Sequence, residues 1–126
     1  MAAAAFGTVP TVGEVVGRIA VETAGLMIQA FAYENPRSWA MRILIEDAET
    51  ENPLSDSGTH GYGAGGGRLS TKVLGDGDLA DVDCWLDFSV GADVSLSAES
   101  VPQEIGRWTG TGTEWTYALV LCLGTT

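Results

Sequence analysis

The clearest pattern in the chain is a strict alternation of apolar and polar positions from Asp81 to Glu99. The even positions are apolar or small: Val82, Cys84, Leu86, Phe88, Val90, Ala92, Val94, Leu96 and Ala98. The odd positions are Asp, Ser, Gly or Glu, with Trp85 as the one large aromatic exception. Side chains of a β-strand point to opposite faces in turn. The stretch therefore predicts β-structure with one buried face and one acidic, wetted face.

This alternating stretch is longer than a single strand, because strands rarely exceed about ten residues. We expect the chain to reverse or bend near Gly91. A three-residue loop there pairs Val90 with Val94, Phe88 with Leu96 and Leu86 with Ala98, which keeps the apolar side chains on one face. One long strand bent by a bulge is the alternative.

Residues 11–34 fit two patterns. As a helix, the segment has a capping box at Thr11 and Glu14 and one apolar stripe. As strands, residues 15–23 and 26–33 alternate and are joined by a turn at Ala24 and Gly25. We favour strands, because three glycines and eight β-branched residues disfavour a helix.

Further strands are expected at residues 39–46, 68–74 and 114–123, the last apolar on both faces and therefore central or covered by another subunit. Residues 47–67 are expected to form a long Gly-rich loop, and its glycines lack the spacing of a phosphate-binding motif. Residues 1–10 resemble a flexible arm of small residues.

We predict one all-β domain over residues 11–126, an antiparallel β-sandwich or jelly-roll-like fold. The alternative is an α+β domain with a helix at residues 11–34 packed on an antiparallel sheet.

The charge of the chain argues against a nucleic-acid partner and against a membrane surface. Seventeen acidic residues outnumber six basic ones, so the formal net charge is −11, and phosphates and anionic lipids repel such a surface. No signal peptide or apolar span is visible, so synthesis in the cytoplasm is expected. The mean hydropathy of +0.14 is high for a lone domain. Copies of the chain or other subunits are therefore expected to cover part of its surface.

Four aspartates form the most suggestive candidate for cation binding: Asp76, Asp78, Asp81 and Asp83. Carboxylates at alternate positions around a turn can converge on Ca²⁺. The spacing fails the EF-hand pattern, which needs Asp or Asn where Ala80 stands and Gly where Asp81 stands. A solvated acidic turn is the favoured interpretation, with Ca²⁺ binding as an alternative and no cofactor otherwise expected.

No catalytic constellation is apparent. His60 is the one histidine, which is too few for an ordinary zinc site. Cys84 and Cys122 lie in expected strands, where apolar surroundings make a thiol inert, and whether they form a disulfide stays open. The nucleophile elbow of the α/β-hydrolases is missing. We therefore expect a protein that is not an enzyme.

Trp85 is the strongest candidate for a contact residue, because a tryptophan on the polar face of a strand is typical of an interface or ligand site. Asp83 and Asp87 flank it on the same face. Phe6 in the arm and Tyr62 in the loop are further interface candidates.

Together these features favour a non-enzymatic structural protein of a larger assembly, acting through protein–protein contacts. By analogy with small β-domains made without a signal peptide, a virion component is expected, either a head decoration or capsid-associated protein or a tail protein. The alternative is a β-sandwich module that binds Ca²⁺ or carbohydrate through residues 76–83 and Trp85. A small hydrolase is a remote third hypothesis.

Overall fold

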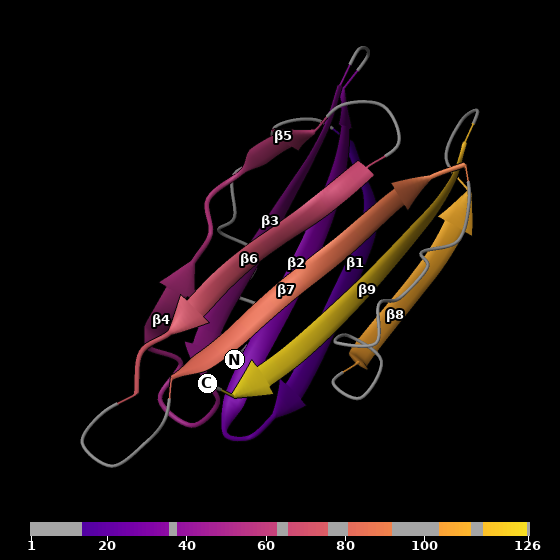
Figure 1. Cartoon of the computed structure of the whole chain (residues 1–126). Coiled ribbons are helices and arrows are strands. Elements are labelled where there is room, and N and C mark those ends of the chain that lie inside the picture. Colours follow the sequence, from indigo (N-terminus) through magenta and orange to yellow (C-terminus); the bar gives the residue numbers. More distant parts are fainter. Residues whose placement is uncertain are drawn as a thin grey trace.

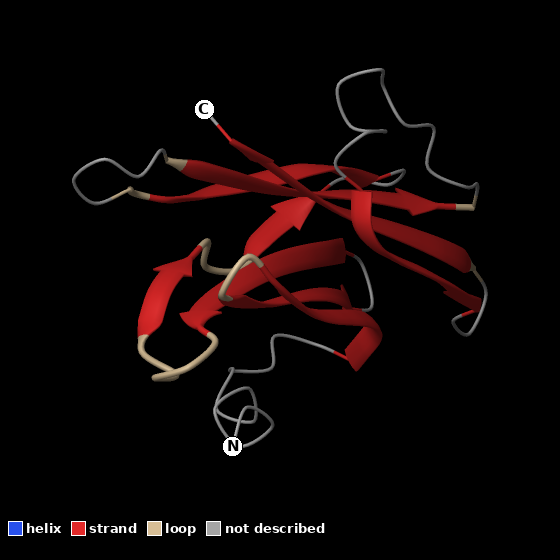
Figure 2. Cartoon of the chain, turned by 90° about the horizontal axis from the view of Figure 1, so that it is seen from below, coloured by secondary structure: helices blue, strands red, loops and turns tan. Residues whose placement is uncertain are grey.

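Two antiparallel β-sheets stack face to face as a β-sandwich (Figures 1 and 2). The computed structural model describes residues 14–35, 38–62, 66–75, 81–91, 104–111 and 115–125, and no helix lies within these ranges. The all-β sandwich is therefore confirmed. The helix considered for residues 11–34 is wrong, because residues 14–35 form two strands. The arm at residues 1–10 lies outside the described residues.

Consecutive strands build each sheet. Sheet A contains β1 (Glu14–Thr23), β2 (Leu26–Asn35), β3 (Ser38–Asp47), β4 (Pro53–Asp56) and β5 (His60–Tyr62), in the order β1-β2-β3-β4 with β5 also paired to β3. Sheet B contains β6 (Gly66–Val73), β7 (Val82–Val90), β8 (Glu104–Thr111) and β9 (Thr116–Thr125), in the order β6-β7-β9-β8. The described chain passes between the sheets once, from β5 to β6. A jelly roll instead exchanges strands between its sheets repeatedly.

The turn at Ala24 and Gly25 determines that the N-terminal region forms a hairpin. Both residues have positive φ, 51° and 78°, as a two-residue type I′ hairpin turn requires. Thr23 pairs with Leu26, and the pairing continues along both strands. The β-branched residues that disfavour a helix then lie on a pleated sheet, where they pack well.

Two short strands lie inside the segment expected to be a loop, residues 47–67. β4 and β5 extend the edge of sheet A beside β3. The hydroxyl groups of Ser55 and Thr71 lie 2.6 Å apart and link β4 to β6 of the other sheet. Gly66 and Gly67, which the sequence placed in the loop, are the first residues of β6.

The alternating stretch forms β7 as far as Val90, and Gly91 follows with φ of 86°. Cys84, Leu86 and Phe88 are buried, as the alternation predicts. The hairpin register expected around Gly91 is wrong, because β7 pairs with β6 on one side and β9 on the other. Phe88 lies opposite Gly67 and Leu119 rather than Leu96. Residues 92–100 lie outside the described residues.

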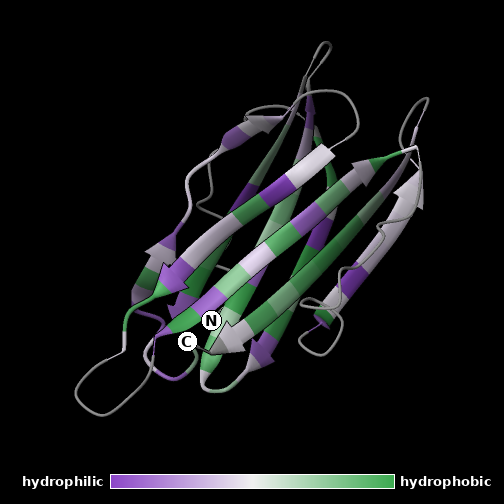
Figure 3. Ribbon diagram, viewed as in Figure 1, coloured by the Kyte–Doolittle hydropathy of each residue, from purple (hydrophilic) through white to green (hydrophobic). Residues whose placement is uncertain are grey.

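β9 occupies the centre of sheet B, between β7 and β8, as its apolar character on both faces predicts. Tyr117, Leu119 and Leu121 point toward sheet A and are completely buried. On the outward face, Ala118 and Val120 are at most 1% exposed. The long run of apolar residues along β9 is visible in Figure 3.

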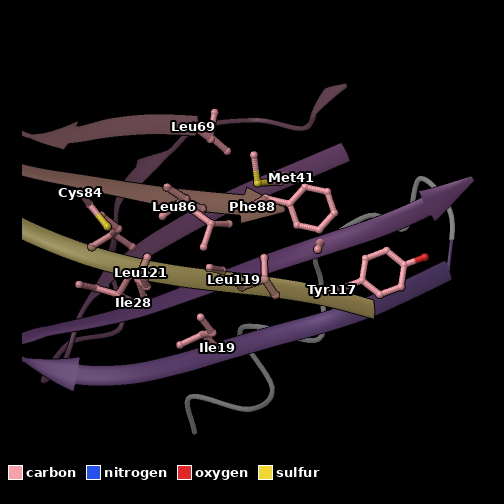
Figure 4. Packing of buried hydrophobic residues seen from close by; sticks show 14 of the residues in the cluster. Ile19, Ile28, Met41, Leu69, Cys84, Leu86, Phe88, Tyr117, Leu119 and Leu121 are labelled. Atoms are coloured by element: carbon pink, nitrogen blue, oxygen red, sulfur yellow. The ribbon is translucent and has the colours of Figure 1, made fainter. Parts of the chain in front are cut away.

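A single main core fills the space between the sheets (Figure 4). Its buried members are Ile19, Leu26, Ile28, Ala30, Ala32, Met41, Ile43, Ile45, Leu69, Cys84, Leu86, Phe88, Tyr117, Leu119 and Leu121. In Figure 4 side chains from β7 and β9 meet Ile19, Ile28 and Met41 of sheet A. Burial of this apolar area is the main contribution to stability, at about 25 cal/mol per Å².

Glycines let the sheets approach closely where β1 lies against β8. A Cβ on Gly17 of β1 would lie 2.4 Å from Leu119 Cδ1 and 2.8 Å from the Trp108 ring. A Cβ on Gly106 of β8 would lie 2.6 Å from Ile19 Cγ2. Because glycine has no Cβ, each strand leaves room for a side chain of the other sheet. This room is needed for close packing.

We predict that Gly17→Ala and Gly106→Ala each lower the free energy of unfolding by about 1–3 kcal/mol, because the added methyl overpacks the core. Equilibrium denaturation in urea measures the change. Gly61→Ala is the matched control, since its Cβ would meet only the Trp39 carbonyl oxygen at 3.8 Å. Stability of Gly17→Ala equal to that of the control would contradict the close-packing argument.

Candidate functional site

The outward face of β6 and β7 carries a compact group of polar side chains around Trp85. The strand register places Arg68 beside Asp87, Ser70 beside Trp85, and Lys72 beside Asp83. Directly opposed residues of an antiparallel pair share a face. We call this group the Trp85 patch: Arg68, Ser70, Lys72, Asp83, Trp85 and Asp87.

The Trp85 side chain is held in place by its neighbours. A Cβ on Gly124 of β9 would lie 3.1–3.2 Å from two atoms of the six-membered ring, so the indole packs on this glycine. The Arg68 guanidinium carbon lies over the ring at 5.8 Å from its centroid, a cation–π distance. Trp85 is half-buried, and these contacts limit the rotamers it can adopt.

Arg68 and Asp87 form a two-point ion pair. Arg68 Nε donates to Asp87 Oδ1 at 2.6 Å, and the Arg68 Nη2 donates to Oδ2 at 3.1 Å. Asp87 is 7% exposed, although the alternation predicted a wetted position. The reason is that the guanidinium covers the carboxylate and satisfies both of its oxygens, which makes burial of the charge tolerable.

The acidic candidates for Ca²⁺ divide into two groups. Asp76 and Asp78 lie outside the described residues. Asp81 and Asp83 face Lys72, whose ammonium nitrogen is 3.9 Å from Asp81 Oδ2 and 3.7 Å from Asp83 Oδ1. Asp81 Oδ1 also accepts a hydrogen bond from the Gly75 amide at 2.9 Å. Within the described ranges no three His, Cys, Asp or Glu side chains gather as a metal site would need.

A shallow pocket of about 350 Å³ opens between β6 and β7 within the Trp85 patch. Its lining residues are Arg68, Ser70, Thr71, Asp83, Cys84 and Trp85. Ser70 is short and stands opposite the large Trp85, which leaves a hollow beside the ring. The pocket thus combines one aromatic wall with a hydroxyl, a carboxylate and a guanidinium.

Tyr62 holds β5 against β6 and is not part of the Trp85 patch. Its hydroxyl donates to the Arg68 carbonyl oxygen at 2.9 Å, and its ring occupies the space over Gly67. Gly66 has φ of 102°, and a Cβ there would lie 1.9 Å from the Phe88 carbonyl oxygen. These two glycines therefore permit close backbone and ring packing. Phe6, the other aromatic candidate, lies outside the described residues.

His60 and the two cysteines occupy separate elements. His60 is exposed on β5, with Nε2 2.7 Å from the Ser57 carbonyl oxygen. Cys84 and Cys122 are buried thiols that are not joined in a disulfide. They point to opposite faces of sheet B, because Cys84 lies opposite Leu123 and Cys122 lies opposite Trp85. Burial raises the pKa of the Cys84 thiol to about 12, and the Cys122 thiol adds to this effect.

Three partners of Trp85 were missed in the sequence: Arg68, Ser70 and Gly124. The first two, with Lys72, occupy the polar positions of the alternating strand 68–74, so a polar column was visible in the pattern. Its position beside β7 was not visible, because local alternation contains no information about which strands pair. The role of Gly124 depends on a neighbour that is distant in sequence.

Comparison of the chain with models of protein families, with curated proteins and with solved structures gives no match. In the described ranges, no helix has the length and apolar character needed to cross a membrane.

We predict that the native protein loses stability as pH rises from about 9 toward 12, in part through Cys84. In this range an unfolded thiol, with a pKa near 9.0, releases its proton while the folded thiol keeps it. The unfolded state is then favoured by up to about 1.4 kcal/mol per pH unit. Urea denaturation at several pH values should give a shallower decline for Cys84→Ala than for the wild type. Equal slopes would contradict the raised pKa.

We also predict that Arg68→Ala lowers the free energy of unfolding by about 2 kcal/mol, because it leaves the buried Asp87 carboxylate without its main donors. The double variant Arg68→Ala/Asp87→Ala should lose less than the sum of the two single variants. Chemical denaturation of all four proteins completes the cycle. Strict additivity would show that the pair contributes no coupling.

Proposed function

We propose that this chain is a non-enzymatic structural protein of a larger assembly, most directly a virion component on the head or tail. It contacts companion subunits through the outward face of sheet B at the Trp85 patch. The observation that carries the proposal is the placement of Trp85. It is half-buried, held by Gly124 and Arg68, and borne on a strand that is paired on both sides.

The composition of the Trp85 patch supports a protein contact. Tryptophan and arginine are the residue types most enriched among the few side chains that dominate binding energy at interfaces. Here they lie next to each other, and the charged pairs of Lys72 with Asp83 and of Arg68 with Asp87 surround the ring. A central aromatic residue with a polar rim is the usual organisation of such a surface. Because the strands are rigid, little conformational entropy is lost on binding.

The charge of the chain supports a position away from packaged nucleic acid. A net charge of −11 repels phosphate backbones, so a part that faces outward in a particle suits it better than one that lines the interior. The cation-binding alternative has less support, because Lys72 already faces both described aspartates of that cluster.

Sedimentation of the protein in extracts of producing cells tests the proposal. We expect the chain to sediment with companion chains, well above its own 13.1 kDa, and Trp85→Ala to move most of it to the monomer position. Trp115→Ala is the matched control, because Trp115 is 43% exposed and contacts Trp39 instead. Circular dichroism verifies that both variants are folded.

Two results would overturn the proposal. One is a wild-type protein that sediments as a stable monomer with no companion chain. The other is a folded Trp85→Ala variant that sediments with its companions as the wild type does.

A further inference from the structure

We infer that the pocket beside Trp85 is a binding site for one ring of a neutral pyranose sugar. The inference stands on the pocket between β6 and β7 and does not require the assembly proposal. It would hold equally for a monomer that never enters a particle.

The aromatic wall of the pocket suits the flat face of a sugar ring. Trp85 of β7 lines the pocket, and Gly124 supports the six-membered ring from the β9 side. The face of an indole is electron-rich, so it attracts the weakly positive C–H groups of a pyranose. A pyranose has such C–H groups on its flat faces and its hydroxyl groups around its rim. Stacking on Trp85 therefore leaves the sugar hydroxyls directed toward the side walls.

The side walls provide matching polar groups. Ser70 contributes a hydroxyl that both donates and accepts, and Asp83 contributes acceptor-only carboxylate oxygens. Arg68 brings a guanidinium whose orientation is fixed by the two hydrogen bonds to Asp87. A sugar hydroxyl is donor and acceptor at once, so it can form a hydrogen bond with any one of these three groups.

Size and charge narrow the ligand class. A pocket of about 350 Å³ lies at the small end of ligand sites, which range from about 300 to 1,000 Å³. It accommodates a single ring, and its open side leaves room for the rest of a glycan. The net charge of −11 disfavours uronic and sialic acids, because their carboxylates are repelled. The Arg68 charge is already balanced by Asp87. A neutral hexose or N-acetylhexosamine fits best.

Titration of the purified, isotope-labelled protein by NMR tests the inference, with the methyl glycosides of glucose, galactose, mannose and N-acetylglucosamine as probes. We expect at least one to cause saturable shifts of backbone amides in β6 and β7, centred on Ser70 and Trp85. The dissociation constant should be roughly millimolar, which is ordinary for a single ring with few contacts. Trp85→Ala should weaken binding at least about tenfold.

A second variant keeps the indole in place, so the test does not depend on whether the Trp85→Ala protein folds. Ser70→Leu fills the hollow from an exposed position while leaving the indole in place, and it should also abolish the shifts. Trp115→Ala is the control that should bind as the wild type does.

The inference is overturned if none of the four glycosides gives saturable shifts, or if binding survives both Trp85→Ala and Ser70→Leu. Because the titration uses the isolated protein, none of these results depends on sedimentation in cells.

Discussion

The close approach of the two sheets at β1 and β8 is the constraint on which the remaining structure depends. Gly17 receives Leu119 and Trp108, and Gly106 receives Ile19. This reciprocal packing brings the inward face of β9 onto sheet A, where its side chains are completely buried. A protein interior is packed as densely as an organic crystal, so the separation of the sheets has little freedom. The position of β9 determines that of β7, and therefore that of the candidate site.

The Trp85 patch combines a rigid support with an irregular surface. β7 is hydrogen-bonded to a strand on each side, so the backbone that carries Trp85 is fixed along its length. The pocket arises because residues of very different size, Ser70 and Trp85, face each other across two strands. The same feature would suit either of the two proposed contacts, with a companion protein or with a sugar, because both use a fixed aromatic ring bordered by hydrogen-bonding groups.

Much of the fold could be predicted from the period-two pattern, since it reports which residues of a strand are buried. It placed Cys84, Leu86 and Phe88 in the core and Trp85 on the outward face. It could not identify β9 as the neighbour of β7, because pairing between segments distant in sequence is decided by competition among all strands. The local hairpin partner was wrong for this reason. The burial of Asp87 was also hidden, since it depends on Arg68, which lies 19 residues away in the chain.

The hydrogen bond from Tyr62 to the Arg68 carbonyl has a consequence for the behaviour of the protein when it is concentrated. Among the described strands β6 pairs with β7 on one side, and its other side is an edge of sheet B. Edges with unpaired carbonyl and amide groups invite strands from neighbouring molecules and so promote fibrillar aggregation. Tyr62 occupies one of these acceptors with a side chain and places a ring beside the strand. It thereby obstructs sheet extension where many copies are crowded together.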